Sequence, residues 1–187
     1  MSGFRIVPVI RAASAELSAT AADWLAAAGL RIIEFTMTTP DALARVQSHR
    51  GRDNMLVACG SILSVAEANA ALKSRAWFIF TPCWVHGVVE RCREAGVAAL
   101  TGAVSTSQVW RAHRAGASAV KLFPATSLGG PGFLKQIRAV FPQALFMPIG
   151  GAKPESVADC LAACAFCIGL ESKVAPSSRL PPATAMV

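Results

Sequence analysis

Residues 97–124 read VAALTGAVSTSQVWRAHRAGASAVKLFP, and this stretch contains a strand, a helix and a second strand. Short apolar runs predict the strands over Val97–Val104 and Ala119–Pro124. Between them, Ser105 stands where a side chain caps the start of a helix over Thr106–Ala115. Strands joined through a helix usually lie parallel in one sheet, because the crossover returns the chain to the edge where it started. The stretch therefore predicts one unit of an α/β fold.

The same alternation continues along the chain in both directions. The predicted strands cover Arg5–Arg11, Leu30–Met37, Met55–Ile62, Trp77–Pro82, Val97–Val104, Ala119–Pro124, Leu145–Gly150 and Ala165–Leu170. The predicted helices cover Ala15–Ala28, Pro40–His49, Val65–Ser74, Trp84–Ala95, Thr106–Ala115, Gly132–Val140 and Pro154–Ala163. Uninterrupted alternation predicts a parallel sheet, and eight strands favour its closure into a (β/α)8 TIM-type barrel.

Residues at the predicted helix ends support these boundaries. Hydroxyl side chains that can cap a helix start occur at Ser14, Thr39, Ser64 and Ser105, and glycines follow helix ends at Gly29, Gly96 and Gly116. After Val174 the chain reads APSSRLPPATAMV, which is rich in Pro, Ser and Ala and has no helical period. We therefore expect a barrel over residues 1–174, an irregular tail over 175–187, and no eighth helix.

The composition limits the classes of function. Hydrophobic residues make up 53% of the 187 residues and charged residues 16%, which excludes a disordered chain. No apolar run is long enough to span a membrane, and no secretory signal is visible at the start, so we expect a cytoplasmic protein without membrane partners. The six cysteines are expected to be reduced thiols. The net charge of +7 comes from scattered basic residues, which favours anionic small molecules over nucleic acid as partners.

Two charged residues interrupt apolar strands. Glu34 lies in LRIIEFTM, on the same predicted strand face as Ile32 and Thr36, and Lys121 lies in ASAVKLFPA. Burial favours the neutral form of an amine, whose lone pair can attack a ketone to form a Schiff base. A nearby carboxylate can then transfer the protons. The alternative is that Glu34 and Lys121 form a buried ion pair with a purely structural role.

A glycine pair follows the seventh predicted strand, in MPIGGAKPES. Gly150 and Gly151 let the backbone approach a ligand closely before the next helix begins. Barrel enzymes often bind phosphate with the loops after strands seven and eight, and Ser172 lies at the end of the eighth. These positions are therefore candidates for a phosphate site, although a glycine pair is also common in tight turns.

Several segments together resemble a known family, the class I 2-keto-3-deoxy-6-phosphogluconate and 4-hydroxy-2-oxoglutarate aldolases. The segments are RIVPVIR, IIEFTMTTPDAL, VKLFPA, FLKQIRAVFP and PIGGAKPES, and they occur in the family's order between Arg5 and Val174. The resemblance implies that Lys121 is the Schiff-base lysine and Glu34 the general acid/base. It also implies a trimer that needs no metal or other cofactor.

The resemblance extends to the substrate-binding residues, with some departures. The candidates are Arg11, Thr36, Ser61, Pro82, Gly150, Gly151 and Ser172. Thr38 stands where some members have an arginine for the pyruvate carboxylate, and Ile149 replaces a frequent threonine. Ser61 stands where the family usually has threonine and keeps the hydroxyl, and we expect Arg11 to contact the ligand or Glu34.

Other cysteine and histidine patterns are weaker signals. Cys160, Cys164 and Cys167 have the spacing of a cluster-binding motif, but they span a helix end and a strand instead of one loop. No histidine pair has the spacing of metal ligands.

The resemblance thus implies an aldolase that cleaves 2-keto-3-deoxy-6-phosphogluconate, 4-hydroxy-2-oxoglutarate or both. The products would be pyruvate and either glyceraldehyde 3-phosphate or glyoxylate. A rival prediction is a non-catalytic barrel that binds a sugar phosphate or a protein partner, with Glu34 and Lys121 as a structural pair.

Overall fold

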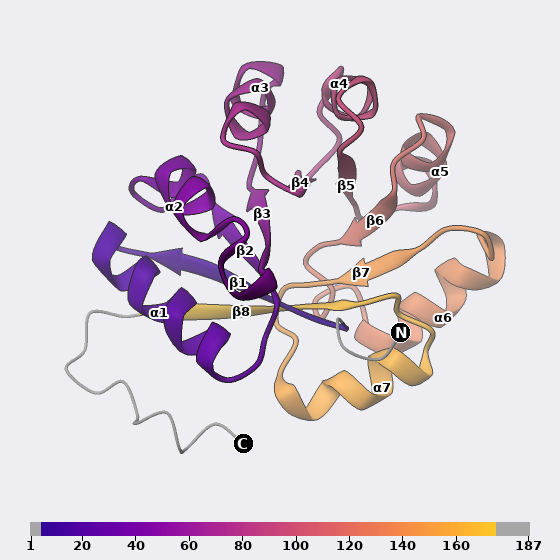
Figure 1. Ribbon diagram of the computed structural model, residues 1–187. Helices are drawn as coiled ribbons and strands as arrows, with labels where there is room; N and C mark the ends of the chain where they lie inside the picture. The colour runs from indigo at the N-terminus through magenta and orange to yellow at the C-terminus, as the bar shows by residue number, and fades with distance from the viewer. Residues whose placement is uncertain (1–4, 175–187) are drawn as a thin grey trace.

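A computed structural model of the chain describes residues 5–174. Its strands and helices alternate, and Figure 1 shows the helices arranged around the outside of the strands. The strands are β1 Ile6–Ala12, β2 Ile32–Thr36, β3 Leu56–Gly60, β4 Phe78–Phe80, β5 Ala98–Ala103, β6 Ala119–Leu122, β7 Phe146–Pro148 and β8 Ile168–Val174. The α-helices are α1 Ala15–Ala27, α2 Ala42–His49, α3 Val65–Lys73, α4 Val88–Glu94, α5 Thr106–Arg114, α6 Gly130–Val140 and α7 Val157–Ala162, with 3-10 turns at Arg52–Asn54 and Pro154–Ser156.

The strands form one parallel sheet in the order β7-β6-β5-β4-β3-β2-β1-β8. Its two edge strands, β7 and β8, meet at one end. There the backbone N–H of Phe166, just before β8, donates to the carbonyl of Phe146 in β7. Further along, Gly169 leaves no room for a Cβ beside the Ile149 side chain. The sheet is therefore a nearly closed barrel, which confirms the predicted (β/α)8 fold.

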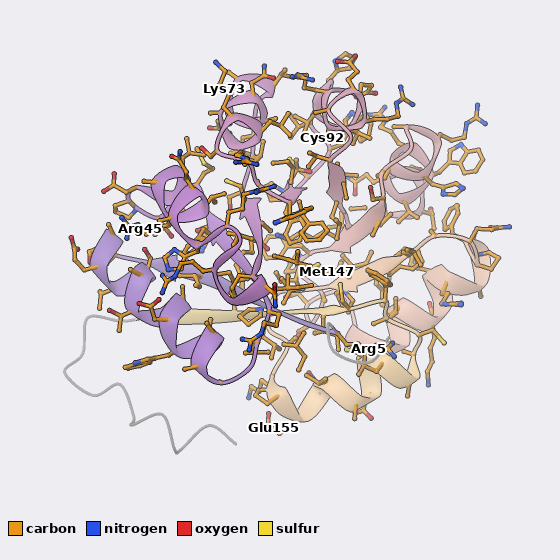
Figure 2. The ribbon with its side chains drawn as sticks, in the orientation of Figure 1. Arg5, Arg45, Lys73, Cys92, Met147 and Glu155 are labelled. Carbon is orange, nitrogen blue, oxygen red and sulfur yellow. The ribbon has the colours of Figure 1, made fainter. Side chains whose placement is uncertain are left out.

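Side chains alternate between the inside of the barrel and the helix layer. One buried cluster fills the inside and includes Val7, Val9, Ala58, Phe80, Leu100, Ala119, Met147, Ile149 and Cys167. Met147 lies near the middle of the barrel in Figure 2, whereas Lys73 and Glu155 lie on the outside. Ile33 and Phe35 of β2 belong to the outer cluster, packed against helices. The period of two therefore leaves Glu34 on the inner face, as predicted.

The helix starts agree with the sequence at three of four positions. The side chains of Ser14, Ser64 and Ser105 accept from the backbone N–H three residues later. The prediction for Thr39 is wrong, because helix α2 begins after Asp41. The Thr39 hydroxyl instead accepts from the backbone N–H of Ala12 at 3.2 Å, which ties the loop after β2 to the end of β1.

The predictions for the tail concern residues 175–187, which lie outside the described residues. Within residues 5–174, no helix is long and apolar enough to cross a membrane.

Candidate active site

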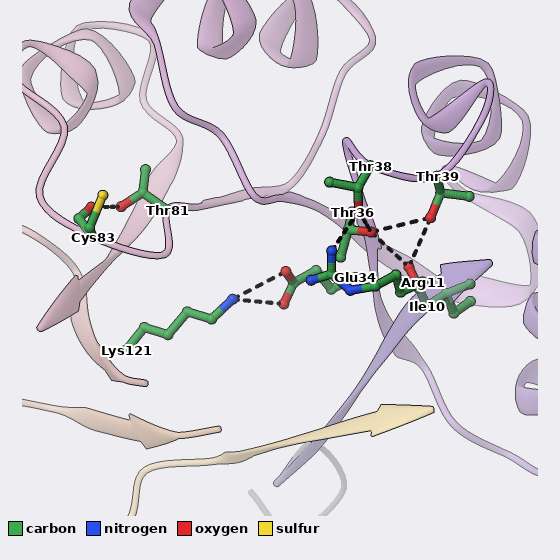
Figure 3. A network of polar contacts seen from close by, with 9 residues as sticks. All are labelled: Ile10, Arg11, Glu34, Thr36, Thr38, Thr39, Thr81, Cys83 and Lys121. Carbon is green, nitrogen blue, oxygen red and sulfur yellow. Dashed lines mark hydrogen bonds and ion pairs between the residues drawn. The ribbon is translucent and has the colours of Figure 1, made fainter. Parts of the chain in front are cut away.

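Glu34 and Lys121 meet inside the barrel although 87 residues separate them. Glu34 comes from β2 and Lys121 from β6, and their relative exposures are 0% and 5%. Lys121 Nζ donates to Glu34 Oε1 at 3.2 Å and to Oε2 at 3.4 Å (Figure 3). The structure thus brings the two predicted catalytic residues into direct contact. An amine and a carboxylate in contact can exchange protons with each other or with a ligand between them.

Two neighbours of this pair were missed in the sequence. Lys121 Nζ lies 5.4 Å from the centre of the Phe80 ring, so an aromatic face covers the ammonium group. On the other side, a Cβ added to Gly60 would lie only 1.7 Å from Glu34 Oε1. Phe80 gave no signal beyond its place in an apolar strand. Gly60 did give one, because a glycine at a strand end often marks the close approach of another group.

The surroundings of Glu34 favour its protonated form. Burial is the main effect, and it raises the pKa of the carboxyl above its ordinary value. The positive charges of Lys121 and Arg11 oppose this rise, and the negative charge of Glu171 adds to it. A carboxyl with a raised pKa can hold and release a proton closer to neutral pH than an exposed one can, which suits a general acid/base.

Arg11 is tied to a group of threonines at the mouth of the barrel. Its Nη1 donates to Thr38 Oγ1 at 2.6 Å, and the Thr38 hydroxyl lies 3.0 Å from that of Thr36 (Figure 3). Thr36 Oγ1 in turn lies 3.3 Å from the Ile10 carbonyl and 3.2 Å from Thr39 Oγ1. Thr38, one of the departures from the family pattern, therefore holds the guanidinium at the end of β1. Arg11 and Thr36 both lie on the side of the site formed by β1 and β2.

The predicted residues Ser61 and Pro82 follow strands β3 and β4. Ser61 comes directly after Gly60 and has a φ of +60°. The Pro82 carbonyl packs against Gly102 of β5 so closely that a Cβ there would lie 2.0 Å from its oxygen. The next carbonyl, of Cys83, accepts from the hydroxyls of Thr81 at 2.7 Å and Thr101 at 3.2 Å. The loops that contain Ser61 and Pro82 therefore start at the ends of β3 and β4, beside the pair formed by Glu34 and Lys121.

The glycine pair after β7 packs against the loop after β6. Gly150 and Gly151 have φ angles of +91° and +76°, which favour glycine, and a Cβ at Gly151 would lie 2.8 Å from the Thr126 side chain. The Gly150 carbonyl accepts from the backbone N–H of Thr126 at 3.1 Å. Ser172 pairs in register with Ile10 in β1, and its side chain lies outside what the structure describes. Gly150 and Gly151 thus lie at the C-terminal ends of the strands.

The described side chains between residues 5 and 174 offer no group of three or more His, Cys, Asp or Glu residues that could hold a metal ion. Cys160 and Cys167 are buried, whereas Cys164 is exposed. Burial raises the pKa of the Cys167 thiol to about 12. Two buried thiols and one exposed thiol fit three separate cysteines better than three ligands of one iron–sulfur cluster.

Comparison with known proteins shows the family of the chain. The family model described as "KDPG and KHG aldolase" matches residues 1–183. The chain is 34% identical to the 2-dehydro-3-deoxy-phosphogluconate aldolase of Pseudomonas aeruginosa over 159 residues, which cover 84% of this chain and 72% of the relative. It is 27% identical to the KHG/KDPG aldolase of Escherichia coli over 166 residues, covering 88% of this chain and 78% of the relative.

Solved structures give the same result. The KDPG aldolase of Legionella pneumophila, with pyruvate captured as a covalent carbinolamine intermediate, has a TM-score of 0.82 and 25% identity over 94% of this chain and 85% of that one. The Zymomonas mobilis 2-keto-3-deoxy-6-phosphogluconate aldolase, with 3-phosphoglycerate, has a TM-score of 0.84 and 25% identity over 97% and 87% of the two chains. Family match, sequence identity and barrel fold agree, and this chain belongs to the KDPG and KHG aldolase family.

Proposed function

We propose that this chain is a Schiff-base aldolase that cleaves a 2-keto acid into pyruvate and an aldehyde. The observation that carries the proposal is the contact of 3.2 Å between Lys121 Nζ and Glu34 Oε1, inside the barrel. Lys121 is the nucleophile and Glu34 moves the protons. The relative from Legionella pneumophila, whose structure holds pyruvate as a covalent carbinolamine, supports covalent chemistry between pyruvate and an amine.

The reaction begins when the neutral amine of Lys121 adds to the ketone carbon of the substrate. The carbinolamine that forms loses water, with Glu34 giving a proton to the leaving hydroxyl. The resulting iminium accepts the electron pair of the breaking carbon–carbon bond, while the hydroxyl at the cleavage site gives its proton to the Glu34 carboxylate and becomes the aldehyde. The enamine takes this proton from Glu34 at its carbon and becomes an iminium again, and addition of water to that iminium releases pyruvate and restores the amine.

The remaining candidate residues surround this pair. We propose that Arg11, Thr36, Ser61 and Pro82 hold the pyruvate part, and that Gly150 and Gly151, together with the backbone of β8 at Ser172, hold the distal end of the aldehyde part. Both 2-keto-3-deoxy-6-phosphogluconate and 4-hydroxy-2-oxoglutarate are substrate candidates, since relatives carry both names. We further propose a cytoplasmic homotrimer that works without a cofactor.

Borohydride trapping tests the proposal. Pyruvate and borohydride should attach a reduced adduct to Lys121, detectable as a fixed mass increase on the peptide that contains it. Lys121→Ala should lose the adduct, whereas the control Lys135→Ala, at an exposed position of α6, should keep it. A wild-type protein that traps no pyruvate would instead favour the rival proposal of a binding barrel with a structural ion pair.

A further inference from the structure

The middle of strand β8 places a carboxylate, Glu171, on the inner face of the barrel. In register, Glu171 pairs with Val9 of β1, and Val9 pairs with Glu34 of β2 on its other side. Val9 belongs to the cluster inside the barrel, and paired residues of neighbouring strands share a face. Ser172 instead pairs with Ile10, which belongs to the outer cluster. Glu171 is therefore the residue that β8 presents on the inner face at this level.

Glu171 lies next to the loop proposed to hold the distal end of the aldehyde. Gly169 of β8 lies directly beside Ile149, the residue that precedes the glycine pair. Glu171 follows Gly169 by two residues, about 6.6 Å further toward the mouth on the same face. Beyond Ile149 the chain leaves the strand, because Gly150 and Gly151 have φ angles of +91° and +76°. The part of β8 that carries Glu171 thus continues from the residue that lies beside the start of the glycine loop.

The charge of Glu171 is not neutralised by a described side chain. Glu171 is exposed, and no cation among residues 5–171 lies within ion-pair distance of it. Arg11 donates instead to Thr38, on the β2 side. Lys153 lines a cavity of about 490 Å³ between the loop after β6 and α7. The effect of Glu171 on the pKa of Glu34 shows that its charge is felt inside the barrel.

We propose that Glu171 determines specificity, by favouring aldehydes with an uncharged, hydroxylated distal end over those that end in phosphate, which makes 2-keto-3-deoxy-6-phosphogluconate the weaker of the two substrate candidates. A carboxylate accepts hydrogen bonds from hydroxyl groups, whereas a phosphate placed beside it meets a charge of the same sign. The assignment of the site to an aldol reaction rests on the proposed function. The repulsion of phosphate by Glu171 does not depend on the proposed function. It can be measured by ligand binding alone.

The test uses Glu171→Gln, which removes the charge and keeps the shape, and the control Glu94→Gln, which removes an exposed carboxylate at the end of α4. Calorimetry measures the affinity of each protein for glycerol 3-phosphate, with glycerol as the uncharged probe. Glu171→Gln should bind glycerol 3-phosphate about tenfold more tightly than wild type at low salt, with a smaller gain at about 1 M salt. Glu94→Gln should match wild type.

A second readout compares the aldol reaction of pyruvate with glyceraldehyde and with glyceraldehyde 3-phosphate. Glu171→Gln should lower KM for the phosphorylated aldehyde more than KM for glyceraldehyde, and it should still trap pyruvate with borohydride. Equal phosphate affinities in wild type and Glu171→Gln, or the same gain in Glu94→Gln, overturn the inference even if trapping succeeds. If trapping fails but the affinity gain is found, the proposed function is wrong and the role of Glu171 stands.

Discussion

Replacing Gly60 by alanine should displace the carboxylate of Glu34. The added Cβ would lie 1.7 Å from Oε1, whereas ordinary contact starts at 3.4 Å, so the oxygen must move by roughly 1.7 Å (3.4 − 1.7). The contact between Oε1 and Lys121 Nζ is 3.2 Å long and cannot survive a shift of that size away from the lysine. Misplacing a catalytic group by about 1 Å can cost roughly 10²-fold in rate, or about 2.7 kcal/mol. Overpacking should also lower the free energy of unfolding by about 1–3 kcal/mol.

Two other glycines provide matched controls for this substitution. Gly132→Ala in α6 meets nothing within 4 Å and should stabilise the protein by roughly 0.5–1 kcal/mol. Gly169→Ala overpacks the barrel wall, and the three atoms nearest to its added Cβ all belong to Ile149, the first of them 2.5 Å away. Urea unfolding and steady-state kinetics of aldol cleavage separate the effects. Wild-type turnover in Gly60→Ala, or an equal loss of kcat in Gly169→Ala, would refute the idea that Gly60 fixes the carboxylate.

Further outcomes follow from the same site and core. Lys121→Ala should abolish cleavage while circular dichroism shows an intact barrel; retained cleavage would exclude the Schiff base. Glu34→Gln should still trap pyruvate but lose about 10²- to 10⁴-fold in kcat. In wild type, the base form of Glu34 is lost as the pH falls through its raised pKa, so the acid limb of kcat/KM should lie above pH 4.5 and vanish in Glu34→Gln. Because the folded pKa is the higher one, the stability that Glu34 contributes should fall as the pH rises through it, and urea midpoints across pH measure this. Burial raises the thiol pKa of Cys59 and Cys167 to about 12, so iodoacetamide at pH 8 should label the exposed Cys83 and Cys164 well before them, as peptide mass mapping would reveal. Sedimentation should show a trimer, and a monomer at micromolar concentration would contradict that proposal.

The alternation of apolar runs and helical segments was enough to predict the barrel. Parallel strands buried on both faces read as short apolar runs, and serine caps such as Ser64 mark helix starts locally, so neither signal needs tertiary information. The charges of Glu34 and Lys121 were conspicuous for the same reason, since an ionisable residue in a buried strand is costly unless it is paired or used. Thr39 was misread because its hydroxyl can serve a helix or a neighbouring strand equally well, and only packing selects between them.

Distances and registers between strands were decided by the tertiary structure. The sequence indicated that Glu34 and Lys121 were functional candidates, but their contact depends on how the sheet curls across 87 residues. The cover that Phe80 provides joins strands β4 and β6, so no local pattern encodes it. Gly60 at a strand end indicated that some group approaches closely, but only the structure shows that this group is the Glu34 carboxylate. In β8, a shift of one residue exchanges the inner and outer faces. The pairing of Glu171 with Val9 therefore decided that Glu171 lies on the inner face of the barrel. Composition and motifs alone could not fix that register.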